Sequence, residues 1–180
     1  PTAGRMAGFE VLKGASSLKH GPNTTGGVIN YLSTPIQNEQ KSKIRGSFGT
    51  FNERVAHAYS GGKLDFAGGQ LGYLLEVFEH SSDGFKEIAG LNGTPNKTAP
   101  ISRSDLLIKL SYESENGHYL EFKAGRMDMD ADVSYQGVSL EDFNANPYLR
   151  YANTEHDNMD AEQTRYYLRY RKELTETAGI

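Results

Sequence analysis

The sequence predicts an all-β protein, and three observations support this fold class. The chain of 180 residues holds 11 Tyr, 8 Phe and 20 Gly. Aromatic residues are enriched in strands, and Gly is enriched in the turns between them. From residue 43 onward, apolar and polar residues alternate in stretches that end at Gly, Asn or Pro. This alternation is typical of half-buried strands joined by turns.

The first region of the chain, residues 1–36, predicts two short strands at 10–13 and 28–33. A single helical turn or bend is expected between them, at 15–20. Pro35 ends the second strand, because proline has no N–H to donate to a ladder. A polar linker at 37–43 then separates this region from the rest of the chain, 44–180.

The second region predicts six longer strands joined by two kinds of connection. Tight reversals are expected at 50–52, 65–69 and 114–117, the last with an Asn-Gly pair suited to a hairpin turn. Long loops are expected at 81–100 and 128–162, and the second of these holds a helical turn at 140–146 that Pro147 ends. The predicted strands are 43–49, 53–64, 70–80, 102–113, 118–127 and 163–173.

The predicted strands have one apolar and one polar face. In 102–113, Leu106, Ile108 and Leu110 alternate with Asp105 and Lys109. Strands of about ten residues with this pattern suit the wall of a transmembrane β-barrel, with the apolar face toward lipid. A soluble β-sandwich has the same alternation, although charged side chains in its core would be costly. Alternation alone leaves both architectures open.

Composition excludes several classes of protein. The net charge is −4 and no basic tract is present, so nucleic acid is not an expected partner. The chain has no Cys, which excludes disulfides and thiolate sites. No apolar run reaches the length of a membrane helix. Both ends of the chain are expected to be cut, since it starts without a Met and ends directly after a strand.

No constellation of residues indicates an enzyme, a metal centre or a cofactor. The five His are scattered, and no Gly-x-Ser-x-Gly motif occurs. Gly21 and Gly26 have the spacing of a phosphate-binding loop, but Gly27-Val28 stands where Lys-Ser or Lys-Thr is required. We therefore expect no catalytic residue, no bound cofactor and no metal.

An acidic run, Asp128-Met129-Asp130-Ala131-Asp132, is similar to the start of a calcium-binding loop. Val133 and Ser139 occupy the positions where such a loop has Gly and Glu. A solvated acidic loop is the favoured interpretation, and a weak surface calcium site stays open.

Residues 9–36 resemble the end of the plug domain of TonB-dependent outer-membrane receptors. The resemblance rests on FEVLKG at 9–14, Gly21-Pro22 and GGVIN at 26–30, in this order. Residues 74–86 (LLEVFEHSSDGFK) and 135–151 (YQGVSLEDFNANPYLRY) resemble the ferric-citrate type within this family. Lys19-His20 departs from the family, which commonly has an aromatic residue just before the glycine.

The resemblance implies a fold and a set of structural residues. Residues 1–36 would be the C-terminal part of the plug, 37–43 a linker, and 44–180 the first six strands of a transmembrane antiparallel barrel of about 22 strands. The plug residues expected to have structural roles, such as positive φ and close strand approach at the glycines, are Lys13, Gly14, Gly21, Gly26, Gly27 and Asn30.

The resemblance also implies a function. Such receptors lie in the bacterial outer membrane, surrounded by lipid, and import a ferric chelate, with iron-dicitrate as the leading candidate here. Energy would come from TonB, through a segment absent from this chain. The alternative is a β-rich surface or adhesion protein that binds without transport.

Five residues are predicted to contact the ligand. Tyr148, Arg150 and Tyr151 lie in the long loop at 128–162, and exposed loops often carry function. Arg165 and Arg169 lie on the polar face of the last strand, and arginine can bind a carboxylate through two hydrogen bonds. For each of these two arginines, pairing with acidic residues of the plug or of the neighbouring wall is the favoured interpretation, and ligand contact is the sharper hypothesis.

Overall fold

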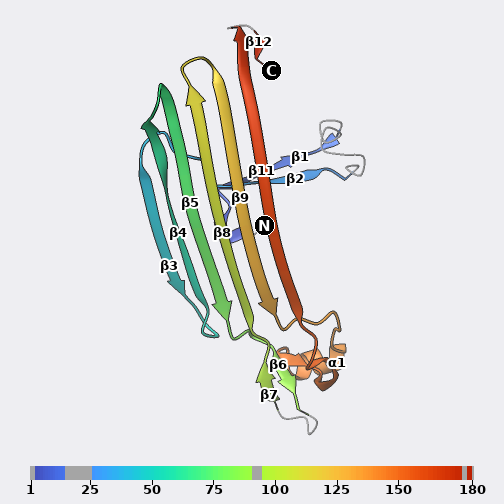
Figure 1. Cartoon of the computed structure of the whole chain (residues 1–180). Helices are drawn as coiled ribbons and strands as arrows, with labels where there is room; N and C mark the ends of the chain where they lie inside the picture. The colour runs from blue at the N-terminus through green and yellow to red at the C-terminus, as the bar shows by residue number, and fades with distance from the viewer. Residues whose placement is uncertain (1–2, 15–25, 91–94, 176–177, 180) are drawn as a thin grey trace.

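The fold is all-β, as predicted. The computed structural model describes residues 3–14, 26–90, 95–175 and 178–179. Its main feature is a seven-stranded antiparallel sheet with the order β12-β11-β9-β8-β5-β4-β3 (Figure 1). The strands are β3 (Lys41–Phe48), β4 (Arg54–Asp65), β5 (Gly69–Ser82), β8 (Ile101–Ser114), β9 (His118–Ala131), β11 (Met159–Thr175) and the short β12 (Ala178–Gly179).

All six predicted long strands are present, and the two that flank the long loop are longer than predicted. β9 continues to Ala131 and β11 begins at Met159. The acidic run from Asp128 was predicted to be a loop, and this is wrong for most of it. Met129 pairs with Arg103 on one side and with Ala161 on the other, so the backbone there is part of the ladder.

Four short strands were not predicted, namely β12 at the edge of the main sheet and three others. β6 (Glu87–Ala89), β7 (Pro95–Thr98) and β10 (Leu149–Arg150) form a small second sheet beyond one end of the main sheet, which we call the loop end (Figure 1). The prediction that they lie in loops is wrong because strands of two to four residues are too short to show alternation. The predicted helical turn is confirmed as α1 (Leu140–Ala145).

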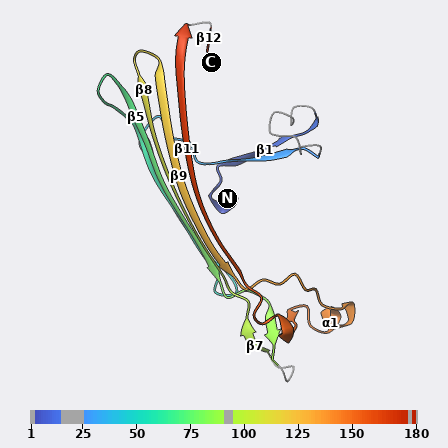
Figure 2. The ribbon, with the colours of Figure 1, turned by 45° about the vertical axis from the view of Figure 1, so that its right-hand side comes forward.

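The N-terminal segment, residues 3–14 and 26–36, begins with a 3-10 turn at Ala3–Arg5 and contains an antiparallel strand pair. β1 (Gly8–Leu12) pairs with β2 (Val28–Leu32), and this pair projects from one face of the main sheet (Figure 2). Asn30 Nδ2 donates to Glu10 Oε2 at 3.0 Å across the pair. The predicted linker at 37–43 is too long, because β3 begins at Lys41 and residues 41–43 pair with β4. The division into domains stays a prediction.

The glycines of this segment have different roles. Gly14 has φ +70° and Gly27 has φ +109°, which confirms the predicted left-handed backbone at both. A Cβ on Gly27 would also lie 2.7 Å from the carbonyl oxygen of Leu12. A Cβ on Gly26 would have no neighbour within 4 Å among the described residues. Gly21 and the turn predicted at 15–20 lie outside the described residues.

The two faces of the main sheet differ in polarity. The inner face, which the N-terminal segment covers, has buried residues such as Leu74, Glu76 and Lys109. The outer face has exposed apolar residues at the alternate positions, such as Leu75 and Ile108. The sheet is open, with β3 at one edge. Within the described residues, no helix combines the length and the apolar character needed to cross a membrane.

Gly27→Ala is expected to loosen the β1–β2 pair. The new methyl group would clash with the Leu12 carbonyl, and φ +109° is strained for alanine, at a cost of about 1–3 kcal/mol. Hydrogen exchange of the β1 and β2 amides should therefore accelerate. Gly26→Ala is the matched control and should leave exchange unchanged; equal acceleration in both variants would contradict the assignment.

Candidate functional site

The N-terminal segment is joined to the inner face of the sheet by a buried polar network centred on Glu76. Glu76 lies on β5 between the inward-facing Leu74 and Phe78, and its side chain is completely buried. Its Oε1 accepts a hydrogen bond from Thr34 Oγ1 at 2.7 Å and lies 2.8 Å from His57 Nε2. Its Oε2 accepts one from Arg5 at 3.2 Å. One carboxylate thus joins both ends of the N-terminal segment to β4 and β5.

Arg5 extends this network to the next strand. Its Nε lies 3.0 Å from Asp105 Oδ1 on β8, and both side chains are buried. The two groups form an ion pair, but their alignment does not meet hydrogen-bond geometry, and neither oxygen of Asp105 has a hydrogen-bond partner among the described residues. The guanidinium of Arg5 therefore lies between the carboxylates of Glu76 and Asp105. The carboxylate of Glu76 also contacts the imidazole of His57.

Two lysines contact the other end of the N-terminal segment. Lys109 Nζ donates to the carbonyl oxygen of Thr34 at 2.6 Å, and Lys123 Nζ donates to Ser33 Oγ at 3.1 Å. Both lysines are on the inner face, and they lie directly opposite each other in the β8–β9 ladder. Residues 33–34 therefore lie between the acidic network and a basic part of the sheet.

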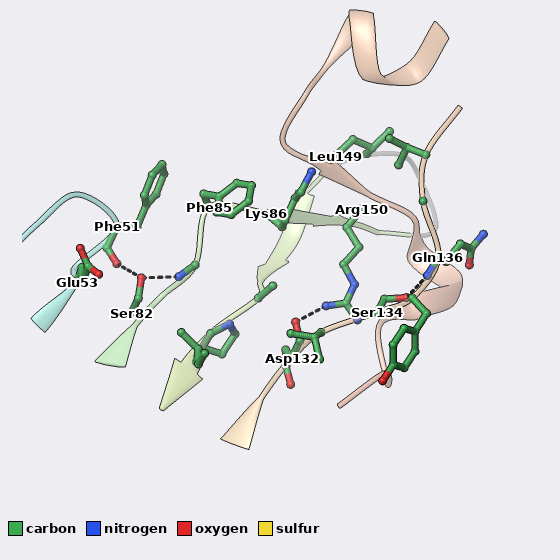
Figure 3. Close-up of a pocket in the computed structure, with 18 of the residues that line it drawn as sticks. Phe51, Glu53, Ser82, Phe85, Lys86, Asp132, Ser134, Gln136, Leu149 and Arg150 are labelled. Atoms are coloured by element: carbon green, nitrogen blue, oxygen red, sulfur yellow. Dashed lines mark hydrogen bonds between the residues drawn. The ribbon is translucent and has the colours of Figure 1, made fainter. Parts of the chain in front are cut away.

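A pocket of about 750 Å³ lies at the loop end of the sheet (Figure 3). It is bounded by the β3–β4 turn, the end of β5, the start of β8, residues 132–138 and β10. Its wall combines aromatic side chains such as Phe51 and Phe85 with polar ones such as Glu53 and Lys86. This mixture of apolar surface and a few polar groups is usual for small-molecule sites.

Arg150 lines this pocket, but its guanidinium is occupied by the protein itself. It is buried and donates to Thr154 Oγ1 at 2.8 Å, to the carbonyl oxygen of Asp132 at 2.6 Å and to that of Asp157 at 3.1 Å (Figure 3 includes the contact with Asp132). A further bond goes to the carbonyl of Thr154. Arg150 thus holds the long loop together, and its predicted contact with a ligand stays a prediction.

The two predicted tyrosines also belong to the long loop, and neither lines this pocket. The Tyr151 hydroxyl donates to Asp142 and accepts from the Ser139 N–H at 3.0 Å. The hydrogen bonds from Tyr151 and then from Ser139 hold the pKa of Asp142 below its ordinary value. Tyr148 is half-exposed, and its N–H donates to Asn146 Oδ1 at 3.0 Å. Tyr148 is thus the more accessible of the two.

A second loop carboxylate, Asp132, is paired across the loop end. Lys97 of β7 lies 2.6 Å from its Oδ2, and this contact is the main cause that lowers the pKa of Asp132. The ion pair ties β7 to the residue that follows β9.

The arginines of β11 differ in their partners. Arg169 lies 2.9 Å from Glu121 and stacks over the Tyr119 ring, with 5.2 Å from its Cζ to the ring centroid. This is the pairing with an acidic wall residue that was the favoured interpretation for Arg169. Arg165 instead lines a second pocket, of about 670 Å³, together with Lys109 and Lys123. The structure therefore places Arg165 and Arg150 in separate pockets.

The residues of the Glu76 network were not identified from the sequence as a site. One signal was available, because a single Glu alternates with Leu74 and Phe78 on the same strand face. A carboxylate between two large apolar neighbours is costly unless it is paired. The partners are not predictable in this way, since Arg5 lies 71 residues away in the chain. Among the described residues, no group of three His, Asp or Glu is arranged to hold a metal ion.

Glu76→Gln is expected to release the N-terminal segment from the sheet. Glutamine would remove the negative charge and one of the two acceptor oxygens that bind Arg5, Thr34 and His57, and breaking a buried ion pair typically costs about 3–5 kcal/mol. Limited proteolysis should then cleave within residues 3–36 far faster than in the unaltered protein. Glu79→Gln, an exposed position on the opposite face of the same strand, is the control, and equal cleavage of both variants would refute this role of Glu76.

Comparison with protein-family models, curated proteins and solved structures finds no significant match to this chain. The function therefore has to be inferred from the residues and geometry of the chain itself.

Proposed function

We propose that this chain is part of a TonB-dependent outer-membrane receptor that imports a ferric chelate, with ferric citrate as the leading candidate. In this proposal the main sheet is a section of the barrel wall, and the N-terminal segment is the end of the plug. The observation that carries the proposal is the distribution of polarity between the two faces of the sheet.

The outer face is apolar and uncovered. Burial of such side chains is the main driving force of folding in water, so large contiguous apolar surfaces are rarely left exposed on soluble monomers. Lipid hydrocarbon would cover this face without any protein partner. Its exposed apolar and aromatic residues are Ile44, Phe48, Leu75, Val77, Leu106, Ile108, Leu110, Leu120, Phe122, Tyr166, Leu168 and Tyr170.

The inner face is polar and is partly covered by the N-terminal segment. Its charged residues Glu76, Asp105 and Lys109 are buried and partnered by that segment. In a soluble sandwich the apolar face would be covered and the charged face would meet water. The arrangement here is the reverse, as expected for a barrel filled by a polar domain.

Strand lengths and connections agree with a membrane wall. β4, β5, β8, β9 and β11 have 12 to 17 residues, whereas a tilted membrane-crossing strand needs about 9–11. At the end of the sheet away from the loops, short turns at 66–68 and 115–117 join the strands. At the loop end, the connections are long and span 83–100 and 132–158. Outer-membrane barrels have short periplasmic turns and long extracellular loops. The short turn at 49–53 is an exception at the loop end.

The open edges of the sheet require further strands if the sheet lies in a membrane. Unpaired backbone groups in hydrocarbon cost several kcal/mol each, so a lipid-embedded sheet needs further strands at both edges. A plugged transporter of about 22 strands would supply them. Energy coupling through TonB belongs to the same proposal.

Single cysteines on adjacent residues of β11 test the membrane position. The chain has no Cys, so each introduced thiol is unique within residues 1–180. In isolated outer membranes, Leu168→Cys on the outer face should not react with a charged, membrane-impermeant maleimide. Tyr167→Cys on the inner face should react, although Leu168 is the more exposed side chain, at 69% against 48%. Reaction at both positions would reject the lipid-facing wall.

Uptake of radioactive iron tests the transport step. Cells lacking the gene should accumulate less iron from ferric citrate than the parent strain, and dissipating the inner-membrane proton gradient should abolish the difference. Binding of the chelate at the cell surface without energy-dependent accumulation would instead support the alternative, a surface protein that binds without transport.

A further inference from the structure

We infer that the inner face of the sheet contains a binding site for a small multivalent carboxylate anion, formed by Lys109, Lys123 and Arg165. This site lies among β8, β9 and β11, and it is distinct from the loop-end pocket. The inference rests on the proposed function for the class of ligand, a carboxylate like that of the citrate chelate. Its experiment measures binding to the folded protein and not uptake, so a failure of binding is distinguishable from a failure of transport.

The first observation is the arrangement of the three cations. Lys109 and Lys123 are directly opposite each other in the β8–β9 ladder. Side chains at such positions have Cβ atoms about 4.5–5.5 Å apart, and like charges there destabilise the sheet. Arg165 pairs with Gly125, the next inward-facing position of β9 after Lys123. Three cations therefore occupy neighbouring inner-face positions on three adjacent strands.

The second observation is that these cations have no anionic partner. In the part of the chain that the structure describes, none of the three forms an ion pair, and the lysines donate only to the uncharged Thr34 carbonyl and Ser33 hydroxyl. Glu121 lines the same pocket, but it is already bound by Arg169 and by the Tyr119 hydroxyl.

Burial makes this excess of positive charge unfavourable. Lys109 is only 7% exposed and Lys123 is partly buried. Cations removed from water are costly unless they are paired. Arg171, on the same strand and face as Arg165, shows the ordinary arrangement, since it lies 3.4 Å from Glu173. An anion among the three unpaired cations would lower their free energy.

The third observation is the pocket itself. Its volume of about 670 Å³ is within the range of small-molecule sites. Ser33, Thr164 and Tyr167 add hydroxyl groups to its wall. A guanidinium can bind one carboxylate through two hydrogen bonds, and each lysine still has donors available, since an ammonium group has three. A ligand with two or three carboxylates on a short carbon skeleton matches this set of donors.

The experiment uses the full-length protein purified in detergent, with tricarballylate as the probe and its neutral triamide as the control ligand. Lysine acylation, mapped by mass spectrometry, should show saturable protection of Lys123 by tricarballylate and none by the triamide. Calorimetry should detect saturable binding that added salt weakens. Arg165→Gln should weaken binding about tenfold or more, because charge-assisted hydrogen bonds are lost. Arg171→Gln should leave the affinity unchanged.

Three results would overturn the inference. The first is the absence of saturable protection and heat. The second is resistance of Lys123 to acylation before any anion is added, because a carboxylate of the protein would then occupy the site. The third is equal weakening by Arg165→Gln and Arg171→Gln, which would indicate general surface charge. Arg165 makes no ion pair among the described residues, so its variant should fold; Lys123→Gln gives a second variant with the same expected loss of affinity.

Discussion

The buried carboxylate of Glu76 is the interaction on which the arrangement of this molecule depends. It accepts hydrogen bonds from residues at both ends of the N-terminal segment and also contacts His57 of the sheet. A buried ion pair adds little net stability compared with apolar packing, but removing one partner is strongly unfavourable. The network therefore selects one position of the segment against the sheet, since any shift would leave a buried charge without its partner.

The polarity of the sheet follows from the same constraint. A strand has two faces with a period of two residues. The inner face carries Glu76, Asp105 and Lys109 beside buried apolar residues such as Leu74, whereas the outer face carries exposed apolar residues such as Leu75. The polar face is contacted from within the chain, by Arg5, Thr34 and Ser33. The apolar face has no such cover within the described residues, and only an apolar environment can cover it without further protein.

The long strands were predictable because their pattern is local and repeated. Alternation over ten or more residues identifies β5, β8, β9 and β11 and assigns each residue to a face. The short strands β6, β7 and β10 were not predictable, because β10 pairs in parallel with β6 about sixty residues earlier in the chain and neither strand is long enough to alternate. Gly14 and Gly27 have the positive φ that glycine adopts more readily than other residues.

The role of a single site residue is harder to predict from the sequence than a long strand is. Arg150 was predicted to face a ligand because it is a loop arginine between two tyrosines. Its acceptors are mainly backbone carbonyls, at residues 132, 154 and 157. Every residue has a carbonyl, so no sequence pattern distinguishes an arginine that binds these groups from one that binds a ligand. Only the folded loop separates the two cases.

The charges of the inner face are arranged in two groups, and the N-terminal segment contacts both. Glu76 and Asp105 form an acidic group on β5 and β8, where the segment places the guanidinium of Arg5. Lys109 and Lys123 form a basic group on β8 and β9, where the segment places a carbonyl and a hydroxyl oxygen. The segment supplies a full positive charge to the acidic group but only neutral oxygens to the basic group. Neutral acceptors fix the position of a lysine without cancelling its charge, so the same contacts that hold the segment in place leave the basic side of the inner face able to attract an anion.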